Sequence, residues 1–274
     1  MTLQCKSIEF CYYWNMKKKF LITVSVLLIL CIGFAAFWYF TYLYKYNQVV
    51  EFRNDRNQDV YILGTYHSQH FNSYMNYSMA DIVNCIKNVD PDVVLIESRE
   101  DTYNEYGVVD GPIDMILAYS YCVQEGIDVG MIDYWKIDND TRPNTTDKNR
   151  DDIIHANILE KLDSTDEGCR VMIICGDTHL HEQTKRFKSD GYEWVTIQDR
   201  RSLFEAQGEF QYPSAMAAVI EDKIEYASTI LVDEINSNVT DDSVREEWLN
   251  TSAVLADTLR RQLELVEDNG LYYT

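Results

Sequence analysis

The feature that most constrains this chain is an uncharged apolar run of 21 residues, at positions 20–40. A helix rises 1.5 Å per residue, so a run of this length spans about 30 Å, the thickness of the hydrocarbon core of a bilayer. The run is too long for the apolar part of a signal peptide, and no clear cleavage site follows it. We therefore expect residues 20–44 to form a transmembrane signal anchor in the lipid bilayer.

The residues that flank this run predict its orientation. Lys17, Lys18 and Lys19 lie directly before it, whereas basic and acidic residues are mixed after it. The positive-inside rule then places residues 1–19 in the cytoplasm and residues 45–274 outside the membrane. Aromatic residues crowd the far end of the run, as they do at membrane–water interfaces; they are Phe37, Trp38, Tyr39, Phe40, Tyr42, Tyr44 and Tyr46.

The region after the anchor is strongly acidic. The whole chain has a formal net charge of −21. The first 45 residues hold five lysines and one acidic residue, a charge of +4, so the other 229 residues carry −25. Because binding to phosphate backbones requires a basic face, we expect no nucleic-acid partner. The content of 46% hydrophobic and 13% aromatic residues excludes a disordered chain.

Short apolar runs alternate with segments of helical periodicity over residues 58–198. Strands are predicted at residues 60–64, 93–96, 127–132, 170–175 and 193–197, and helices at residues 79–89, 113–124, 151–162 and 179–189. This alternation is typical of an α/β fold with a mainly parallel central sheet flanked by helices. Two long helices, at residues 215–232 and 241–267, form a C-terminal helical extension over residues 212–270. We expect them to pack on the sheet; the alternative is a lid or an oligomerisation element.

Two copies of a G-x-x-H pattern carry the strongest functional signal. Gly64 and His67 follow the first predicted strand, and Gly176 and His179 follow the fourth in the same way. Glu97 follows the second predicted strand. The carboxyl ends of parallel strands share one edge of a sheet, where α/β proteins bind ligands. We therefore expect the two imidazoles and the carboxylate to converge in one pocket.

These motifs, together with an arginine that opens the helix before the second one, Arg150, resemble the TraB/Tiki superfamily. Its wider relatives include erythromycin-esterase-like and ChaN-like proteins. The resemblance covers roughly residues 58–198 and implies a hydrolase, which in Tiki-like members would be a metal-dependent peptidase at a membrane surface. The chain departs from the pattern at His70 and His181, which are additional imidazoles, and at Asp177, where small residues are usual.

The chemistry of these residues agrees with a hydrolase that activates water. Two neutral imidazoles and a carboxylate suit Zn²⁺, Mn²⁺ or Co²⁺ and leave positions open for water. The candidate ligands are His67, Glu97 and His179, with His70 and Asp177 as further candidates. Arg150 would stabilise developing oxyanion charge or clamp a substrate carboxylate. In the metal-free alternative, one histidine or Glu97 is the general base; the sequence leaves both open.

Three residues beside the two histidines are expected to shape the pocket. Gly64 and Gly176 allow unusual dihedral angles and a close approach of backbone to substrate, and Tyr66 is a candidate lining residue. The sequence lacks the G-x-S-x-G and H-E-x-x-H motifs, which argues against a serine hydrolase and a zincin.

The favoured function is therefore a membrane-anchored extracytoplasmic hydrolase of a peptide or small-molecule substrate. One alternative is a non-enzymatic haem- or metal-binding protein that uses the same histidine pair, as a ChaN-like resemblance would allow. Another is a surface signalling-inhibitor protein that keeps the site without turnover, as in TraB-like pheromone-shutdown proteins. Haem binding would produce a Soret band, and a chelator that abolishes peptide hydrolysis would separate a metallopeptidase from the inhibitor.

Overall fold

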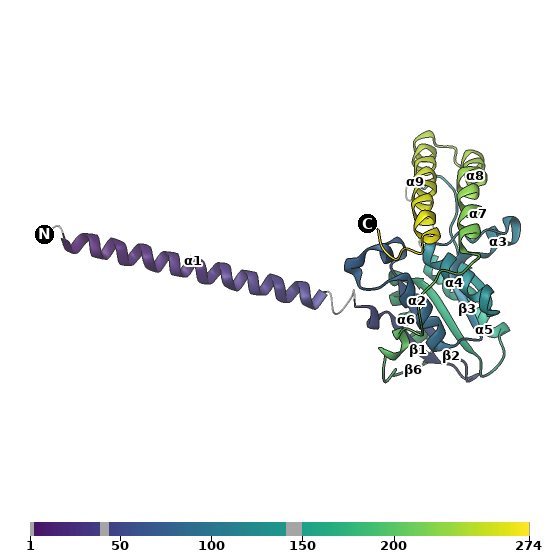
Figure 1. Ribbon diagram of the computed structural model, residues 1–274, viewed down its shortest axis with the longest axis horizontal. Coiled ribbons are helices and arrows are strands. Elements are labelled where there is room, and N and C mark those ends of the chain that lie inside the picture. The colour runs from purple at the N-terminus through teal and green to yellow at the C-terminus, as the bar shows by residue number, and fades with distance from the viewer. Residues whose placement is uncertain (1–2, 39–43, 141–149, 274) are drawn as a thin grey trace. The chain divides into compact units, whose positions relative to one another are not determined.

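The computed structural model describes residues 3–38, 44–140 and 150–273. The chain forms two compact units, Met1–Asn47 and Gln48–Thr274. The first consists of a long helix, α1 (Leu3–Trp38), and a short 3₁₀ helix, η2 (Lys45–Asn47). The second contains the sheet and the other helices (Figure 1).

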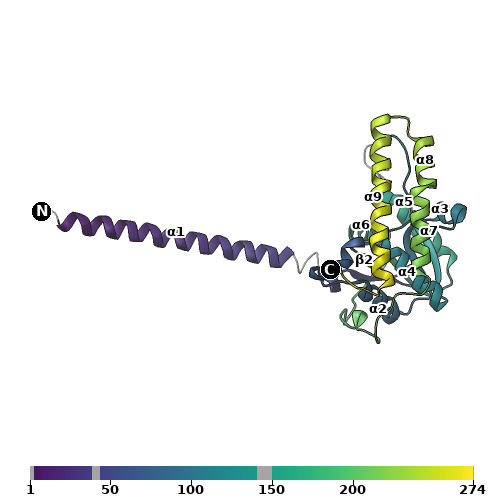
Figure 2. The same cartoon turned by 45° about the horizontal axis from the view of Figure 1, so that its top comes forward.

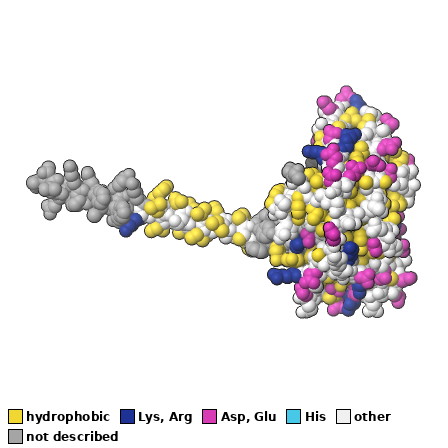
Figure 3. All heavy atoms as spheres, in the orientation of Figure 1, with side chains coloured by type: hydrophobic (Ala, Val, Ile, Leu, Met, Phe, Trp, Pro, Cys, Tyr) yellow, Lys and Arg dark blue, Asp and Glu magenta, His cyan; other side chains and the backbone are white. Residues whose placement is uncertain are grey.

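Helix α1 has the properties of a membrane-crossing segment. Its part Lys18–Phe37 is long and apolar enough to span a bilayer, and none of it is buried. Figure 3 shows hydrophobic side chains along this part of the helix. Exposing so many large apolar side chains to water is unfavourable, so this surface suits lipid. The helix is consistent with a signal anchor or a signal sequence; residues 39–43 of the expected span lie outside the described residues.

The second unit is an α/β fold with a six-stranded, mostly parallel mixed sheet flanked by helices, which confirms the expected fold class. The strand order is β4-β3-β5-β2-β1-β6. Neighbours among β4, β3, β5 and β2 are parallel, and β1 is antiparallel to both β2 and β6. The strands are β1 (Val49–Arg53), β2 (Asp59–Thr65), β3 (Val93–Arg99), β4 (Asp128–Asp133), β5 (Arg170–Gly176) and β6 (Glu193–Val195).

Helices cover both faces of this sheet. They are α2 (Met79–Val89), α4 (Ile113–Glu125), α5 (Arg150–Ser164) and α6 (Asp177–Ser189). The connections through α2 and α4 run outward along the sheet, and the connection through α5 returns from β4 to β5. Right-handed crossovers therefore place α5 on the opposite face from α2 and α4. This reversal creates a crevice at the carboxyl ends of β3 and β5, the usual ligand position in such sheets.

Local sequence explains these elements. Helix α2 begins at a capping box in which Ser78 and Asp81 satisfy each other's exposed backbone groups. On the face of the sheet opposite α2 and α4, Ile154 and Ile158 of α5 and Phe187 of α6 pack with buried strand residues such as Ile62 and Ile173. The four cysteines of this unit are free thiols: Cys85, Cys122 and Cys175 are buried, and Cys169 is partly exposed.

Some elements differ from the sequence expectation. Strand β1 was not expected, because its central Glu51 interrupts a run of only five residues; the structure buries Glu51 opposite Tyr61 of β2. Strand β6 is shorter than the expected 193–197 and pairs at the antiparallel edge. The short helices were also not expected: η3 (His67–Phe71), η4 (Ser73–Met75), α3 (Glu100–Tyr106) and η5 (Ser202–Phe204).

The C-terminal region forms a helical hairpin with its own hydrophobic core (Figure 2). The expected helix at 215–232 is divided at Thr229 into α7 (Met216–Ser228) and α8 (Ile230–Asn238). These pack against the long α9 (Asp242–Glu267). We expected these helices to pack on the sheet; α7 instead packs on α4, and α4 contacts β3 and β4. This position carries residues of α7 and α9 to the carboxyl edge of the sheet.

Candidate functional site

The three residues at the centre of the sequence hypothesis converge. Glu97 is buried near the end of β3, where the pairing with β4 shifts register between Ile96 and Arg99. Its Oε1 lies 3.3 Å from Nε2 of His179, and its Oε2 accepts the N–H of Gly176 at 2.6 Å. A Cβ added to Gly176 would lie 2.9 Å from Nε2 of His67 and 3.4 Å from Oε2 of Glu97. Nε2 of His179 therefore contacts the Glu97 carboxylate, and Nε2 of His67 and Oε2 of Glu97 both lie beside Gly176.

Both motif glycines lie where a larger residue would clash with a neighbouring side chain. A Cβ on Gly176 would press on the His67 ring, and one on Gly64 would lie 2.7 Å from Cδ2 of Leu180. Neither glycine adopts a positive φ, so the expected need for unusual dihedral angles is wrong at both positions. The unusual backbone belongs to His67, whose φ is +53°. Residues other than glycine rarely adopt this left-handed backbone conformation, and those that do cluster at functional sites.

A carboxylate fixes each imidazole from behind, a fully buried one for His67 and a partly exposed one for His179. Nδ1 of His67 donates to Oδ2 of Asp114 at 3.1 Å, and Asp114 in α4 has no exposed side-chain surface. Nδ1 of His179 donates to Oδ1 of Asp151 at 2.7 Å. Neither aspartate was a candidate from the sequence. Asp151 had one available signal, its place directly after Arg150, whereas Asp114 is 47 residues from His67 and had none.

Arg150 joins Glu97 to a second buried acid at the end of β4, Asp133. Its Nη2 donates to Oε1 of Glu97 at 3.0 Å and to Oδ1 of Asp133 at 2.7 Å, and its Nε also donates to Asp133, at 2.9 Å. Such two-point contacts between a guanidinium and a carboxylate fix geometry as well as charge. Asp133 was not a sequence candidate, and Asn149, which precedes Arg150, lies outside the described residues.

These contacts shift the pKa values of the histidines and of Glu97 in opposite directions. Burial lowers the pKa of His67, but the charge and hydrogen bond of Asp114 outweigh it and raise that pKa to about 9. Burial likewise opposes protonation of His179, but hydrogen bonds to Asp151 and Glu97 raise its pKa to about 10. Burial raises the pKa of Glu97, whereas the bond from His179 and the nearby cations lower it to about 2. Near neutrality the resting site therefore holds two imidazolium ions and an ionised glutamate.

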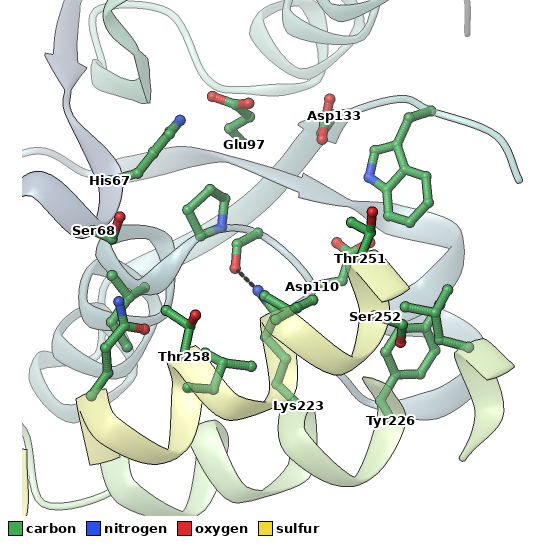
Figure 4. Close-up of a pocket in the computed structure, with 18 of the residues that line it drawn as sticks. His67, Ser68, Glu97, Asp110, Asp133, Lys223, Tyr226, Thr251, Ser252 and Thr258 are labelled. Carbon is green, nitrogen blue, oxygen red and sulfur yellow. Dashed lines mark hydrogen bonds between the residues drawn. The ribbon is translucent and has the colours of Figure 1, made fainter. Parts of the chain in front are cut away.

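The convergence point opens into a cavity of about 350 Å³ that is lined by the carboxyl edge of the sheet and by the hairpin (Figure 4). His67 and Glu97 lie on one side of it, and Lys223 of α7 and Thr258 of α9 on the other. His67 reaches this space with 38% of its side chain exposed, compared with 12% for His179. The wall also includes Asp133, Arg150, Pro112, Ile113, Trp135, Tyr226, Leu231, Trp248, Leu255 and Leu259. The cavity thus joins a charged end to an apolar one.

The remaining candidates serve other contacts. His70 is fully buried, where its Nε2 accepts the N–H of Tyr66 at 2.8 Å and its Nδ1 donates to the carbonyl of Tyr77 at 2.8 Å. Both ring nitrogens are therefore occupied by the fold. Tyr66 packs its ring against those of His70 and Tyr77, and its hydroxyl accepts from Gln48. Asp177 opens α6 and pairs with His181 at 3.5 Å.

The donor set does not fit a divalent metal in this arrangement. Among the residues that the structure describes, no three His, Cys, Asp or Glu side chains are grouped so as to hold a metal ion. Both oxygens of Glu97 already accept hydrogen bonds, one from Gly176 and one from the guanidinium of Arg150. A divalent cation at Glu97 would have to displace that positive charge. The metal site of His67, Glu97 and His179 stays a prediction of the sequence.

No family model, curated protein or solved structure matches this chain. The resemblance to the TraB/Tiki superfamily therefore rests on the motif residues alone.

Proposed function

We propose that this protein is a membrane-anchored hydrolase of TraB/Tiki type that activates water with His67 to cleave a peptide or ester bond. The observation that carries the proposal is the pairing of His67 with the buried Asp114 at the wall of a cavity. An imidazole whose Nδ1 is held by a carboxylate presents Nε2 as a proton acceptor, the arrangement used in general-base catalysis. His67 is also the more exposed of the two histidines.

The proposed reaction begins from the form in which Nε2 of His67 is unprotonated. His67 takes a proton from water as the water oxygen bonds to the carbonyl carbon, and Asp114 stabilises the imidazolium that forms. The C–O or C–N bond then breaks, and the same proton passes from His67 to the leaving group. The products are a carboxylic acid and an alcohol or amine, so atoms and charges balance.

Arg150 and Glu97 have different roles in this proposal. The guanidinium of Arg150 lines the cavity and stabilises the negative charge that develops on the carbonyl oxygen. Glu97 is ionised and holds Arg150 in place through Oε1. His179 is a positioning residue, since it contacts Glu97 with Nε2 and is fixed by Asp151 through Nδ1.

The proposed location follows from the N-terminal helix and its flanking charges. Lys17, Lys18 and Lys19 support an orientation in which residues 1–19 are cytoplasmic and residues 45–274 lie outside the membrane. The anchor would hold the hydrolase at a bilayer surface. Acidic side chains are prominent on the face of the second unit in Figure 3, and such a surface repels anionic polymers.

The test is hydrolysis by the full chain in nanodiscs. A panel of aryl esters and fluorogenic peptides is compared for the wild type, His67→Gln and the control His181→Gln, whose side chain is 49% exposed. We expect at least one substrate for which His67→Gln lowers kcat by about 100-fold or more while the control retains the rate. A chelator is expected to leave the rate unchanged. Equal rates in the three proteins would refute the site, and loss of activity with chelator that Zn²⁺, Mn²⁺ or Co²⁺ restores would support the metal alternative.

A further inference from the structure

Lys223 is an ammonium group buried in the cavity wall. It lies on α7 with only 2% of its surface exposed, and it faces the site from the side opposite His67 and Glu97 (Figure 4). Among the described residues, its ammonium donates to a carbonyl oxygen, that of Gly111, instead of a carboxylate. A buried cation that lacks an anionic partner is costly, so this position calls for an explanation.

The nearest acids are committed to other partners. The carboxylate of Asp110 accepts from Nε of Arg99 at 2.6 Å and from the hydroxyl of Ser98 at 2.9 Å. Asp114 holds His67. Burial lowers the pKa of Lys223 to about 8, and the charges of these two aspartates oppose the decrease. Lys223 therefore remains mostly protonated near neutrality, with hydrogen-bonding capacity beyond its bond to Gly111.

The position of Lys223 links it to the reaction centre. A Cβ on Gly111 would lie 2.2 Å from the carbonyl oxygen of Glu97, so the residue that binds the ammonium is in direct contact with the backbone of Glu97. The cavity beyond is apolar and aromatic. Trp135 and Trp248 stack there with ring centroids 6.0 Å apart, and Leu255 and Leu259 line the same space.

We propose that this cavity selects a small, mainly apolar substrate that carries a carboxylate, and that Lys223 binds that carboxylate. This inference rests on the proposed function in that the ligand is the substrate of the same site. A single ammonium matches a monoanion, and Glu97 and Asp133 in the same wall disfavour a more highly charged group. The apolar wall supplies affinity for the rest of the molecule, and the ion pair supplies selectivity.

The test is calorimetric titration of the full chain in nanodiscs with 4-phenylbutyrate and with its neutral isostere 4-phenylbutanamide, after subtraction of empty nanodiscs. We expect the wild type to bind the carboxylate about tenfold or more tightly than the amide at pH 7. In Lys223→Met, which preserves chain length and removes the charge, this preference is expected to disappear while amide binding is retained. The control Lys185→Met removes an exposed lysine and is expected to keep the preference.

The outcomes separate this inference from the proposed hydrolase. A wild type that binds both compounds equally or binds neither overturns the inference, and so does a Lys223→Met protein that keeps the preference. The wild-type comparison decides the question even where the variant does not fold. Ester hydrolysis without carboxylate preference refutes the inference alone, whereas carboxylate preference without hydrolysis of any panel substrate refutes the proposed reaction alone.

Discussion

His67 and Asp114 form a hydrogen-bonded pair across two elements of the fold, with Nδ1 of the imidazole 3.1 Å from Oδ2 of a fully buried carboxylate. His67 begins the 3₁₀ helix after β2, and Asp114 lies in the first turn of α4. When His67 is neutral, the pair keeps its proton on Nδ1 and leaves Nε2 unprotonated at the cavity. It also holds a residue whose backbone φ of +53° is unusual for any residue other than glycine.

Replacement of Gly176 should test how closely this ring is positioned. In Gly176→Ala the new methyl group would lie 2.9 Å from Nε2 of His67, so the ring must move. Because small displacements of a catalytic group lower the reaction rate, we expect kcat on a panel substrate that the wild type hydrolyses to fall by about 10- to 100-fold. In the control Gly270→Ala the methyl group would lie 3.0 Å from the flexible end of Leu265 and 3.5 Å from its carbonyl oxygen, an ordinary contact, so this variant should retain activity. Similar rates in both variants would contradict the proposed position of His67.

Arg150→Lys should separate charge from geometry. Lysine keeps the positive charge between Glu97 and Asp133, but it cannot reproduce the two-point contact that Arg150 makes with Asp133 while bonding Glu97. We expect kcat to fall by about 100-fold with little change in KM, since the loss affects the transition state. A variant with raised KM and unchanged kcat would instead indicate that Arg150 binds the ground state of the substrate.

The site should also affect stability at high pH. The pKa of His179 is raised from 6.5 to about 10 in the folded protein, so its contribution to stability is complete below pH 6.5 and is lost as the pH rises towards 10. The wild-type Tm is therefore expected to fall over this range, and His179→Gln is expected to show a shallower decline. Tm values from pH 6 to pH 10 by circular dichroism provide the measurement. Parallel Tm curves for the two proteins would show that His179 is not held as the structure indicates.

The N-terminal helix leads to a prediction about location. Because the segment Lys18–Phe37 is apolar and unburied, the full chain is expected to remain in the membrane pellet after alkaline carbonate extraction. Protease added to intact cells is expected to digest the region after residue 45, given the lysines at positions 17–19. Extraction into the carbonate supernatant would contradict an anchor, and protection from protease in intact cells would contradict the orientation.

The central part of the site could be predicted from sequence because it depends on local order. Each motif histidine follows an apolar strand and a glycine, and the parallel pairing of β2 with β5 brings Gly64 opposite Cys175 and Thr65 opposite Gly176. That register follows from strand topology, so His67, Glu97 and His179 were expected at one edge. The space required at the two glycines depends on neighbours such as Leu180, which sequence alone does not place.

The residues that surround His67, Glu97 and His179 could not be predicted, because their positions depend on how distant elements pack together. Asp114 and Asp133 come from elements whose side chains meet His67 and Arg150 only after the sheet and helices have packed. Lys223 reaches the cavity because α7 packs on α4, a contact that helical periodicity does not indicate. The strand β1 was missed because burial of Glu51 is specified by its neighbours across the sheet and not by its own run of residues.

The most direct test of the account is the pH dependence of kcat/KM in the wild type and in Asp114→Asn. Because His67 must lose its proton to act as the base, the wild-type rate is expected to rise with pH, to be half-maximal near the His67 pKa of about 9, and to level off above it. Removing the charge of Asp114 should move this rise to lower pH. It should also lower the plateau by about 100-fold or more, because an asparagine amide would favour the tautomer with the proton on Nε2. An unshifted rise with an unchanged plateau would contradict the role of the His67–Asp114 pair.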